Sequence, residues 1–92
     1  MKLINRGILH DFKQRHPDAS SQVDAWEAEV TDAGWNMPSD IKKRYGAASF
    51  LKDNNVVFNI KGNKYRLRVR VSYKSQIVFI MKAGTHAEYM TW

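Results

Sequence analysis

The sequence predicts an α+β fold, with N-terminal helices packed on one face of a small, mainly antiparallel sheet of three or four strands. Between residues 5 and 46, apolar residues recur at the spacing of amphipathic helices. From Asn55 onward, apolar and polar residues alternate in runs that short turns separate. The length of 92 residues suits one small core, so we expect a single domain over residues 1–92.

The N-terminal segment predicts a short strand followed by a helix. Residues 2–4, KLI, are suited to an edge strand. In the segment that follows, NRGILHDFKQRHP, the apolar residues share one helical face, Asn5 is the expected N-cap, and Pro17 should end the helix. We expect both histidines of this segment, His10 and His16, to occupy surface positions.

Two further helices are expected before the strands. One begins near Asp18 or Ser20, repeats its apolar residues at i, i+3 and i+7, and is capped at its C-terminus by Gly34. The other is the segment MPSDIKKRYG, in which Pro38 stands at the start and Gly46 at the end. The apolar faces of these helices need a partner, and the strands offer the largest apolar face.

Three strands with short turns should form an antiparallel meander. In the second strand, Arg66, Arg68 and Arg70 alternate with apolar residues, so one face is apolar and the other carries three guanidinium groups. Because the helices should cover the apolar face, the arginines should stand in an open row, about 7 Å apart along the strand. The expected strands are NVVFNI (residues 55–60), KYRLRVRVSY (64–73) and IVFIMKAG (77–84).

The positive charge is concentrated in the C-terminal part of the chain. Residues 1–53 contain eight Lys and Arg and eight acidic residues, whereas residues 54–92 contain seven Lys and Arg and one acid, Glu88; these segments sum to a net charge of +6. A surface charged only for solubility usually mixes both signs, so this pattern favours binding of a polyanion over a merely solvated basic surface. The residues expected to contact nucleic acid are Lys64, Arg68, Arg70, Lys74 and Lys82.

Several kinds of site and location are not indicated. The chain has no cysteine, which rules out disulfides and thiolate zinc sites and is typical of a reducing compartment. No apolar run has the length of a signal peptide or a membrane span. We therefore expect a cytoplasmic protein that needs no membrane, and the lack of a carboxylate cluster predicts neither a metal nor another cofactor.

The segment VVFNIKGNKYRLRVRVSYKSQIVFIMKAGTHAEY, residues 56–89, resembles the HigB-like toxins of the RelE superfamily, most closely at FNI, GNKYRL and GTHAEY. The resemblance implies a RelE-like fold and the toxin of a type II toxin–antitoxin system. It further implies an mRNA interferase, a ribosome-dependent endoribonuclease that cuts translated mRNA in the ribosomal A site. The implied partner is a HigA-like helix-turn-helix antitoxin.

The resemblance also assigns roles to individual residues. Arg66 aligns with the arginine of the family's YRL strand and is expected to hold the scissile phosphate, a task suited to a planar, permanently charged group. His86, in GTHAEY, is expected to act as general acid, because an imidazole titrates at about pH 6.5. Tyr89 could stack on a base, orient the phosphate or shuttle a proton. Lys61 or Lys64 is the candidate base, if neighbouring cations lower its pKa.

These assignments fit RNA cleavage by its own 2′-hydroxyl, which needs a base, cations around the phosphorus and an acid for the leaving oxygen. Thr85 and Glu88 have the spacing of a capping box, so we expect Glu88 to cap a helix. Many relatives carry an aspartate where this chain has Met90, and Met90 and Trp92 are expected to serve packing. The alternative function is a non-catalytic RNA- or ribosome-binding domain that uses the same basic face.

Overall fold

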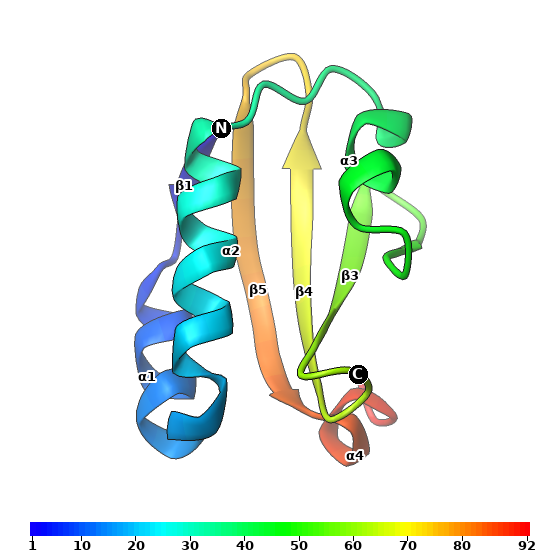
Figure 1. Ribbon diagram of the computed structural model, residues 1–92. Coiled ribbons are helices and arrows are strands. Elements are labelled where there is room, and N and C mark those ends of the chain that lie inside the picture. The colour runs from blue at the N-terminus through cyan, green and yellow to red at the C-terminus, as the bar shows by residue number, and fades with distance from the viewer.

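The computed structural model describes residues 1–92 and contains four α-helices and one five-stranded sheet (Figure 1). The α+β prediction is confirmed, but the sheet has five strands instead of three or four. The additional strand, β2, has two residues, too few for an alternating pattern to reveal it. The elements are β1 (Lys2–Ile4), α1 (Gly7–Arg15), a 3-10 turn (Pro17–Ala19), α2 (Ser20–Asp32), α3 (Pro38–Arg44), β2 (Ser49–Phe50), β3 (Asn55–Ile60), β4 (Tyr65–Ser72), β5 (Ile77–Thr85) and α4 (His86–Tyr89).

The strand order is β1-β5-β4-β3-β2, so β4 lies at the centre of the sheet. The predicted meander of β3, β4 and β5 is antiparallel, while β1 pairs with β5 in parallel. The pairing of β4 with β5 is irregular, because Arg68 lies opposite Lys82 whereas the next residue, Val69, lies opposite Ile80. Met81 is thus the extra residue of a β-bulge, a feature that increases the local twist of a sheet.

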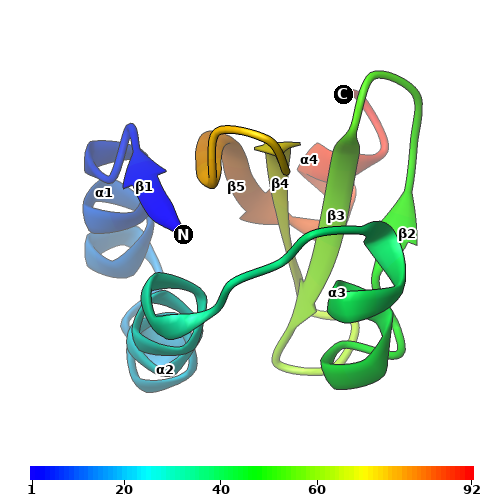
Figure 2. The same ribbon diagram turned by 90° about the horizontal axis from the view of Figure 1, so that it is seen from above.

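The helices and the sheet share one hydrophobic core. Figure 2 shows α2 and α3 on one side of the sheet, and the segment after α4 leads to the other side. The apolar positions of β4 are buried, as the alternation of its sequence predicts. None of the helices is long and apolar enough to cross a membrane. The helical residues in the core are Leu9, Phe12, Val23, Trp26, Val30 and Ile41.

Two predicted helix caps are wrong. Asn5 adopts a left-handed backbone with φ +69° and donates its side-chain amide to the Ile80 carbonyl at 3.3 Å, so it ties the β1–α1 connection to β5 and leaves Arg6 at the N-cap. The C-cap of α2 is Ala33 with an extended backbone, and Gly34 has no positive φ. In both places the backbone conformation that leads the chain to its next element differs from the one that a capping residue requires, although Asn and Gly are residues that favour caps.

The two histidines of the first helical segment differ in their environment. His10 is exposed, as predicted. His16 is half-buried, because its ring packs against Phe12 and Tyr65 with centroid distances of 5.1 and 4.8 Å. The surface prediction for His16 is therefore wrong, since β4 comes from a distant part of the sequence to cover it.

Candidate functional site

The three arginines of β4 lie on the sheet face opposite α2 and α3 (Figure 2), but they are not equally open. Arg66 is 9% exposed, Arg68 is half-buried and Arg70 is exposed. The prediction of a fully open row is therefore wrong at its first member. The physical reason is that α4 folds back over the start of β4, as the contacts of Arg66 show.

Arg66 is held in place without an acidic partner. Its Nη1 donates to the Asn63 carbonyl at 2.9 Å and to the Tyr65 carbonyl at 3.2 Å, and its guanidinium carbon lies 5.3 Å from the Tyr89 ring centroid. Its Nε and Nη2 have no hydrogen-bond partner in the protein and are not fully buried. Arg66 therefore presents an oriented, uncompensated cation whose free N–H groups suit a phosphate oxygen.

The helix α4 begins where β5 ends, and a capping box fixes the junction. The Glu88 N–H donates to Thr85 Oγ1 at 3.1 Å, and the Thr85 N–H donates to Glu88 Oε1 at 2.9 Å, which confirms the predicted capping role. The Thr85 N–H is also the main reason that the pKa of Glu88 is lowered. The His86 N–H donates to the Lys64 carbonyl at 3.0 Å, so the start of α4 is also tied to the residue that precedes β4.

Three of the predicted site residues come together at this end of the sheet. The rings of His86 and Tyr89, on α4, are 6.2 Å apart, and the Tyr89 ring also packs on the Arg66 guanidinium at 5.3 Å. His86 is exposed and Tyr89 is half-buried. The cluster thus combines an uncompensated cation, a solvent-accessible imidazole and a phenol, which are groups that can hold charge and transfer protons at one phosphate.

Gly84 is a site-building residue that the sequence reading missed. It is buried in β5 directly opposite Arg66. A Cβ placed there would lie 2.9 Å from Glu88 Oε1 and 3.3 Å from Glu88 Cβ. The glycine therefore leaves room for the capping carboxylate. In the sequence, the position of Gly84 as the first residue of the GTHAEY motif is the feature that could have indicated this role.

We predict that Gly84→Ala displaces the Glu88 carboxylate from the Thr85 N–H. Loss of a cap costs about 1 kcal/mol, so the free energy of unfolding should fall by about that amount. The RNA cleavage that the resemblance implies should fall further, because α4 carries His86 and Tyr89. Thermal unfolding and cleavage rates of the variant check this, with Gly46→Ala as the matched control, since a Cβ at Gly46 meets nothing within 4 Å. Equal effects of the two substitutions would contradict the role of Gly84.

Lys61 lies in the β3–β4 turn, at the end of the sheet that carries α4 (Figure 1). Its side chain is exposed and makes no ion pair, while its N–H donates to Gln22 Oε1 at 2.8 Å. Both Lys61 and Gly62 have positive φ, +54° and +65°. A lysine in the left-handed region is strained, and such strain concentrates at functional sites.

Lys64 is unsuited to the role of base. Its ammonium donates to Asp18 Oδ2 at 2.9 Å, and this hydrogen bond is the main cause of a raised pKa for Lys64. The condition under which Lys64 was a candidate base, a lowered pKa, is thus contradicted. The same contact from Lys64, followed by that from Tyr65, lowers the pKa of Asp18 from 3.8 to about 2.

The Asp18 contacts predict a specific dependence of stability on pH. The pKa of Asp18 is lower in the folded state, so its stabilising contribution is complete above the unfolded value of 3.8 and is lost as the pH falls to about 2. The melting temperature of the wild type should therefore exceed that of Asp18→Asn at neutral pH, and the difference should shrink below about pH 4. Thermal unfolding at several pH values measures this difference. The control Asp11→Asn removes an exposed carboxylate without contacts and should show no such difference; a pH-independent gap for Asp18→Asn would refute the prediction.

The remaining predicted RNA contacts spread along the same face. Arg68 donates from Nε to Asn55 Oδ1 at 3.0 Å and lies opposite Lys82, and Arg70 lies opposite Phe79. Lys74 is in the β4–β5 turn at the far end of the sheet, so it does not join the cluster around Arg66. None of the six ion pairs in the structure involves a basic residue of this face: Lys61, Arg66, Arg68, Arg70, Lys74 or Lys82.

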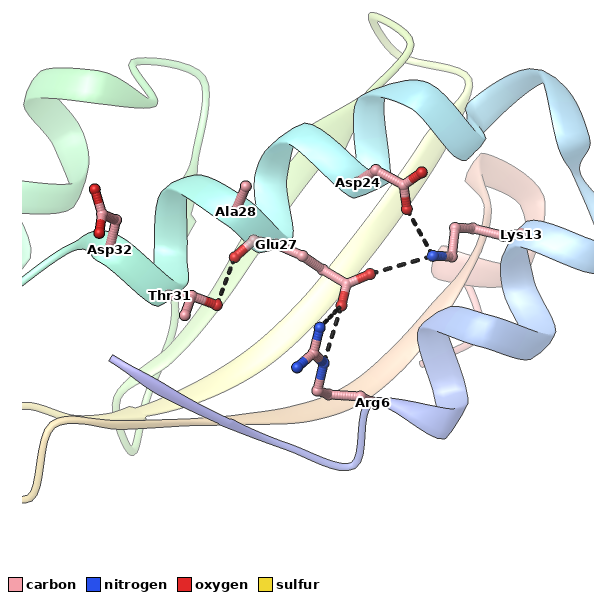
Figure 3. Close-up of a pocket in the computed structure, with 7 residues that line it drawn as sticks. All are labelled: Arg6, Lys13, Asp24, Glu27, Ala28, Thr31 and Asp32. Carbon is pink, nitrogen blue, oxygen red and sulfur yellow. Dashed lines mark hydrogen bonds and ion pairs between the residues drawn. The ribbon is translucent and has the colours of Figure 1, made fainter.

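The larger of the two surface pockets lies elsewhere, between α1 and α2, and has a volume of about 360 Å³ (Figure 3). Four of its charged residues are paired: Arg6 donates twice to Glu27 Oε2, at 2.9 and 3.1 Å, and Lys13 donates to Asp24 Oδ1 at 2.6 Å. This network joins the two helices and leaves Asp32 as the one lining residue with an unpaired charge. No group of three or more His, Cys, Asp or Glu side chains is arranged to hold a metal ion.

Comparisons with known proteins identify the family of this chain. A family model described as "HigB_toxin, RelE-like toxic component of a toxin-antitoxin system" matches residues 19–92. The mRNA interferase toxin HigB of Escherichia coli strain K12 is 28% identical over 91 residues, which cover 97% of this chain and 88% of that protein. The mRNA interferase HigB of Shigella flexneri has the same identity and coverage. The chain belongs to the HigB family of RelE-like toxins, the toxic components of toxin–antitoxin systems.

Proposed function

We propose that this toxin is an mRNA interferase, an endoribonuclease that cuts translated mRNA. The observation that carries the proposal is the setting of Arg66: two backbone carbonyls orient its guanidinium beneath Tyr89, whose ring also neighbours His86, and no carboxylate neutralises it. A buried cation with free N–H groups calls for an anion, and the phosphodiester of RNA is the anion that the relatives' name, mRNA interferase, indicates.

The chemistry begins with attack of the RNA 2′-hydroxyl oxygen on the neighbouring phosphorus. Lys61 takes the hydroxyl proton, and Arg66 donates from Nε and Nη2 to the phosphoryl oxygens, where negative charge grows in the transition state. The bond to the 5′-oxygen breaks, and His86 gives that oxygen a proton. The products are a 2′,3′-cyclic phosphate and a 5′-hydroxyl, so protons and charge balance without another reactant. Tyr89 fits the role of orienting the phosphate, since its ring packs on the Arg66 guanidinium.

The shape of this site supports action on the ribosome. Neither surface pocket is lined by Arg66, His86 or Tyr89, so these residues lie on an open face and not in an enclosed cavity. An open face cannot by itself hold a flexible strand in line for reaction, whereas the ribosomal A site presents a codon in fixed geometry. The unpaired basic residues along β4 and β5 are placed to contact the phosphates of the message or of ribosomal RNA.

The same face supports a partner of opposite charge. We propose that the partner antitoxin is HigA-like, with a helix-turn-helix domain for DNA and an acidic segment that covers the basic face. Occupation of Arg66 and Arg70 by carboxylates would exclude RNA phosphates by direct competition. Neutralisation should therefore weaken as the salt concentration rises.

An in vitro translation reaction with primer-extension mapping tests the proposed function. Wild-type protein should produce breaks within codons of the translated message and none in the same message without ribosomes. A block of protein synthesis with intact message would show a non-catalytic RNA- or ribosome-binding protein instead. The neighbouring open reading frame, co-expressed, should abolish the breaks.

We predict that two replacements of Lys61 separate its chemistry from its strain. Lys61→Ala and Lys61→Gly should both lower cleavage, by about 100-fold if Lys61 is the base. Glycine adopts a positive φ without strain, whereas alanine does not. This advantage exceeds the larger loss of chain entropy that glycine undergoes on folding, so the free energy of unfolding should be higher for Lys61→Gly than for Lys61→Ala by about 0.5–1 kcal/mol. Cleavage rates and urea unfolding measure the two effects. Full activity of either variant would show that another group removes the proton.

A further inference from the structure

Trp92 is an aromatic residue of the active face that the proposed chemistry does not use. Its ring meets the Tyr89 ring edge-on with centroids 5.6 Å apart, and the backbone N–H of Trp92 donates to the Tyr89 carbonyl at 3.1 Å. The Lys82 ammonium lies 5.9 Å from its ring centroid. The two rings therefore lie next to each other with a cation at either end, in the order Arg66, Tyr89, Trp92, Lys82.

The setting of Trp92 does not fit the packing role that its sequence position indicated. Trp26 and Trp35 are 3% and 6% exposed and belong to the hydrophobic core, whereas Trp92 is half-exposed and belongs neither to the core nor to the residues packed against it. Its aromatic and cationic neighbours, Tyr89 and Lys82, lie outside the core as well. A large indole kept at a basic surface is typical of sites that stack nucleic acid bases.

The Lys82 contact leaves the indole available to a base. A distance of 5.9 Å is at the outer limit of a cation–π interaction, and Lys82 is exposed and forms no ion pair. Such a contact is worth about 0.5–1 kcal/mol at an exposed site, so a base can replace the ammonium over the ring. The displaced ammonium then lies beside the strand, where it can pair with a phosphate.

We propose that Trp92 is a stacking platform for a message base adjacent to the phosphate held by Arg66. The inference rests on the proposed function and adds a specificity determinant to it. Tyr89 separates the two residues by the width of one aromatic ring, which places the stacked base next to the scissile phosphate instead of at it. Because purines offer the larger stacking surface, the proposal includes a preference for a purine at that position.

Ribosomes stalled with a vacant A site and programmed with short messages test the stacking. The messages carry an adenine codon, or the same codon with one abasic nucleotide at each of its three positions in turn. Rates of cleavage, as kcat/KM, are measured for wild type, Trp92→Phe and Trp92→Leu. Met90→Ala serves as control, because Met90 is 70% exposed in the same segment and should behave as wild type.

Stacking predicts a loss that depends on the base. Trp92→Leu should lower cleavage of the adenine codon about 5- to 100-fold, Trp92→Phe should retain most activity, and at one abasic position Trp92→Leu should equal wild type. If Trp92 only supports Tyr89, Trp92→Leu will lower cleavage of every message by the same factor, which overturns the inference while the proposed function stands. Failure of wild type to cut any message would overturn the proposed function itself.

Discussion

Arg66→Ala should lower the rate of mRNA cleavage by about 100- to 1,000-fold, the usual loss when a donor to the transition-state oxyanion is removed. The free Nε and Nη2 groups of Arg66 are the only oriented cationic donors beneath Tyr89. Arg66→Lys should not restore the rate, since one ammonium cannot both bond the Asn63 and Tyr65 carbonyls and reach a phosphate in a planar fork. Primer extension in an in vitro translation reaction measures the rates.

Arg70→Ala is the matched control for Arg66. Arg70 lies on the same face of the same strand but is exposed and makes no hydrogen bond or ion pair through its side chain. Its replacement removes the same charge, so it should cost less than about 10-fold through weaker attraction of RNA, an effect that high salt should erase. Equal losses for the two variants would mean that charge alone matters, and that the buried geometry of Arg66 has no catalytic value.

His86→Ala should lower cleavage by about 100- to 10,000-fold, the range for loss of a general acid. His86 is exposed, and its backbone, which the substitution retains, makes the hydrogen bond to Lys64, so the fold should survive. Circular dichroism and thermal unfolding should show little change. A message with a sulfur atom in place of the leaving 5′-oxygen distinguishes the general-acid role of His86 from any other role of that side chain.

The sulfur-substituted message gives opposite results for the two variants. A thiolate leaves without a proton, so the message with 5′-sulfur should be cut by His86→Ala at nearly the wild-type rate. Arg66→Ala should remain slow on that message, because stabilisation of the phosphoryl charge is still needed. If sulfur does not restore the rate of His86→Ala, His86 is not the general acid.

Local rules were enough to predict most of the fold. The alternation of apolar and polar residues gave the three strands β3, β4 and β5 within one residue at each end. The spacing of Thr85 and Glu88 predicted the capping box, because both partners lie within one turn of helix. The edge strand β1 was also predicted, although its parallel pairing with β5 depends on residues about 75 positions apart, for which the sequence has no local signal.

Tertiary contacts account for what the sequence did not predict at the site. The spacing of the arginines gave their shared face, but the burial of Arg66 follows from α4, which folds back onto β4. Lys64 is a candidate base by sequence alone, but its ammonium is bound by Asp18, 46 residues earlier, and this contact has no local signal in the sequence. Gly84 was overlooked because its role depends on the position of the Glu88 side chain.

The most direct test is the cleavage of one translated message that carries a single 2′-deoxy nucleotide at the mapped break. The chemistry proposed for the site of Arg66, His86 and Tyr89 uses the RNA 2′-hydroxyl as nucleophile, so the deoxy message should stay intact at that position while the ribose message yields a 2′,3′-cyclic phosphate and a 5′-hydroxyl. Cleavage of the deoxy message at the same place and rate would contradict this chemistry and the assigned roles of all three residues.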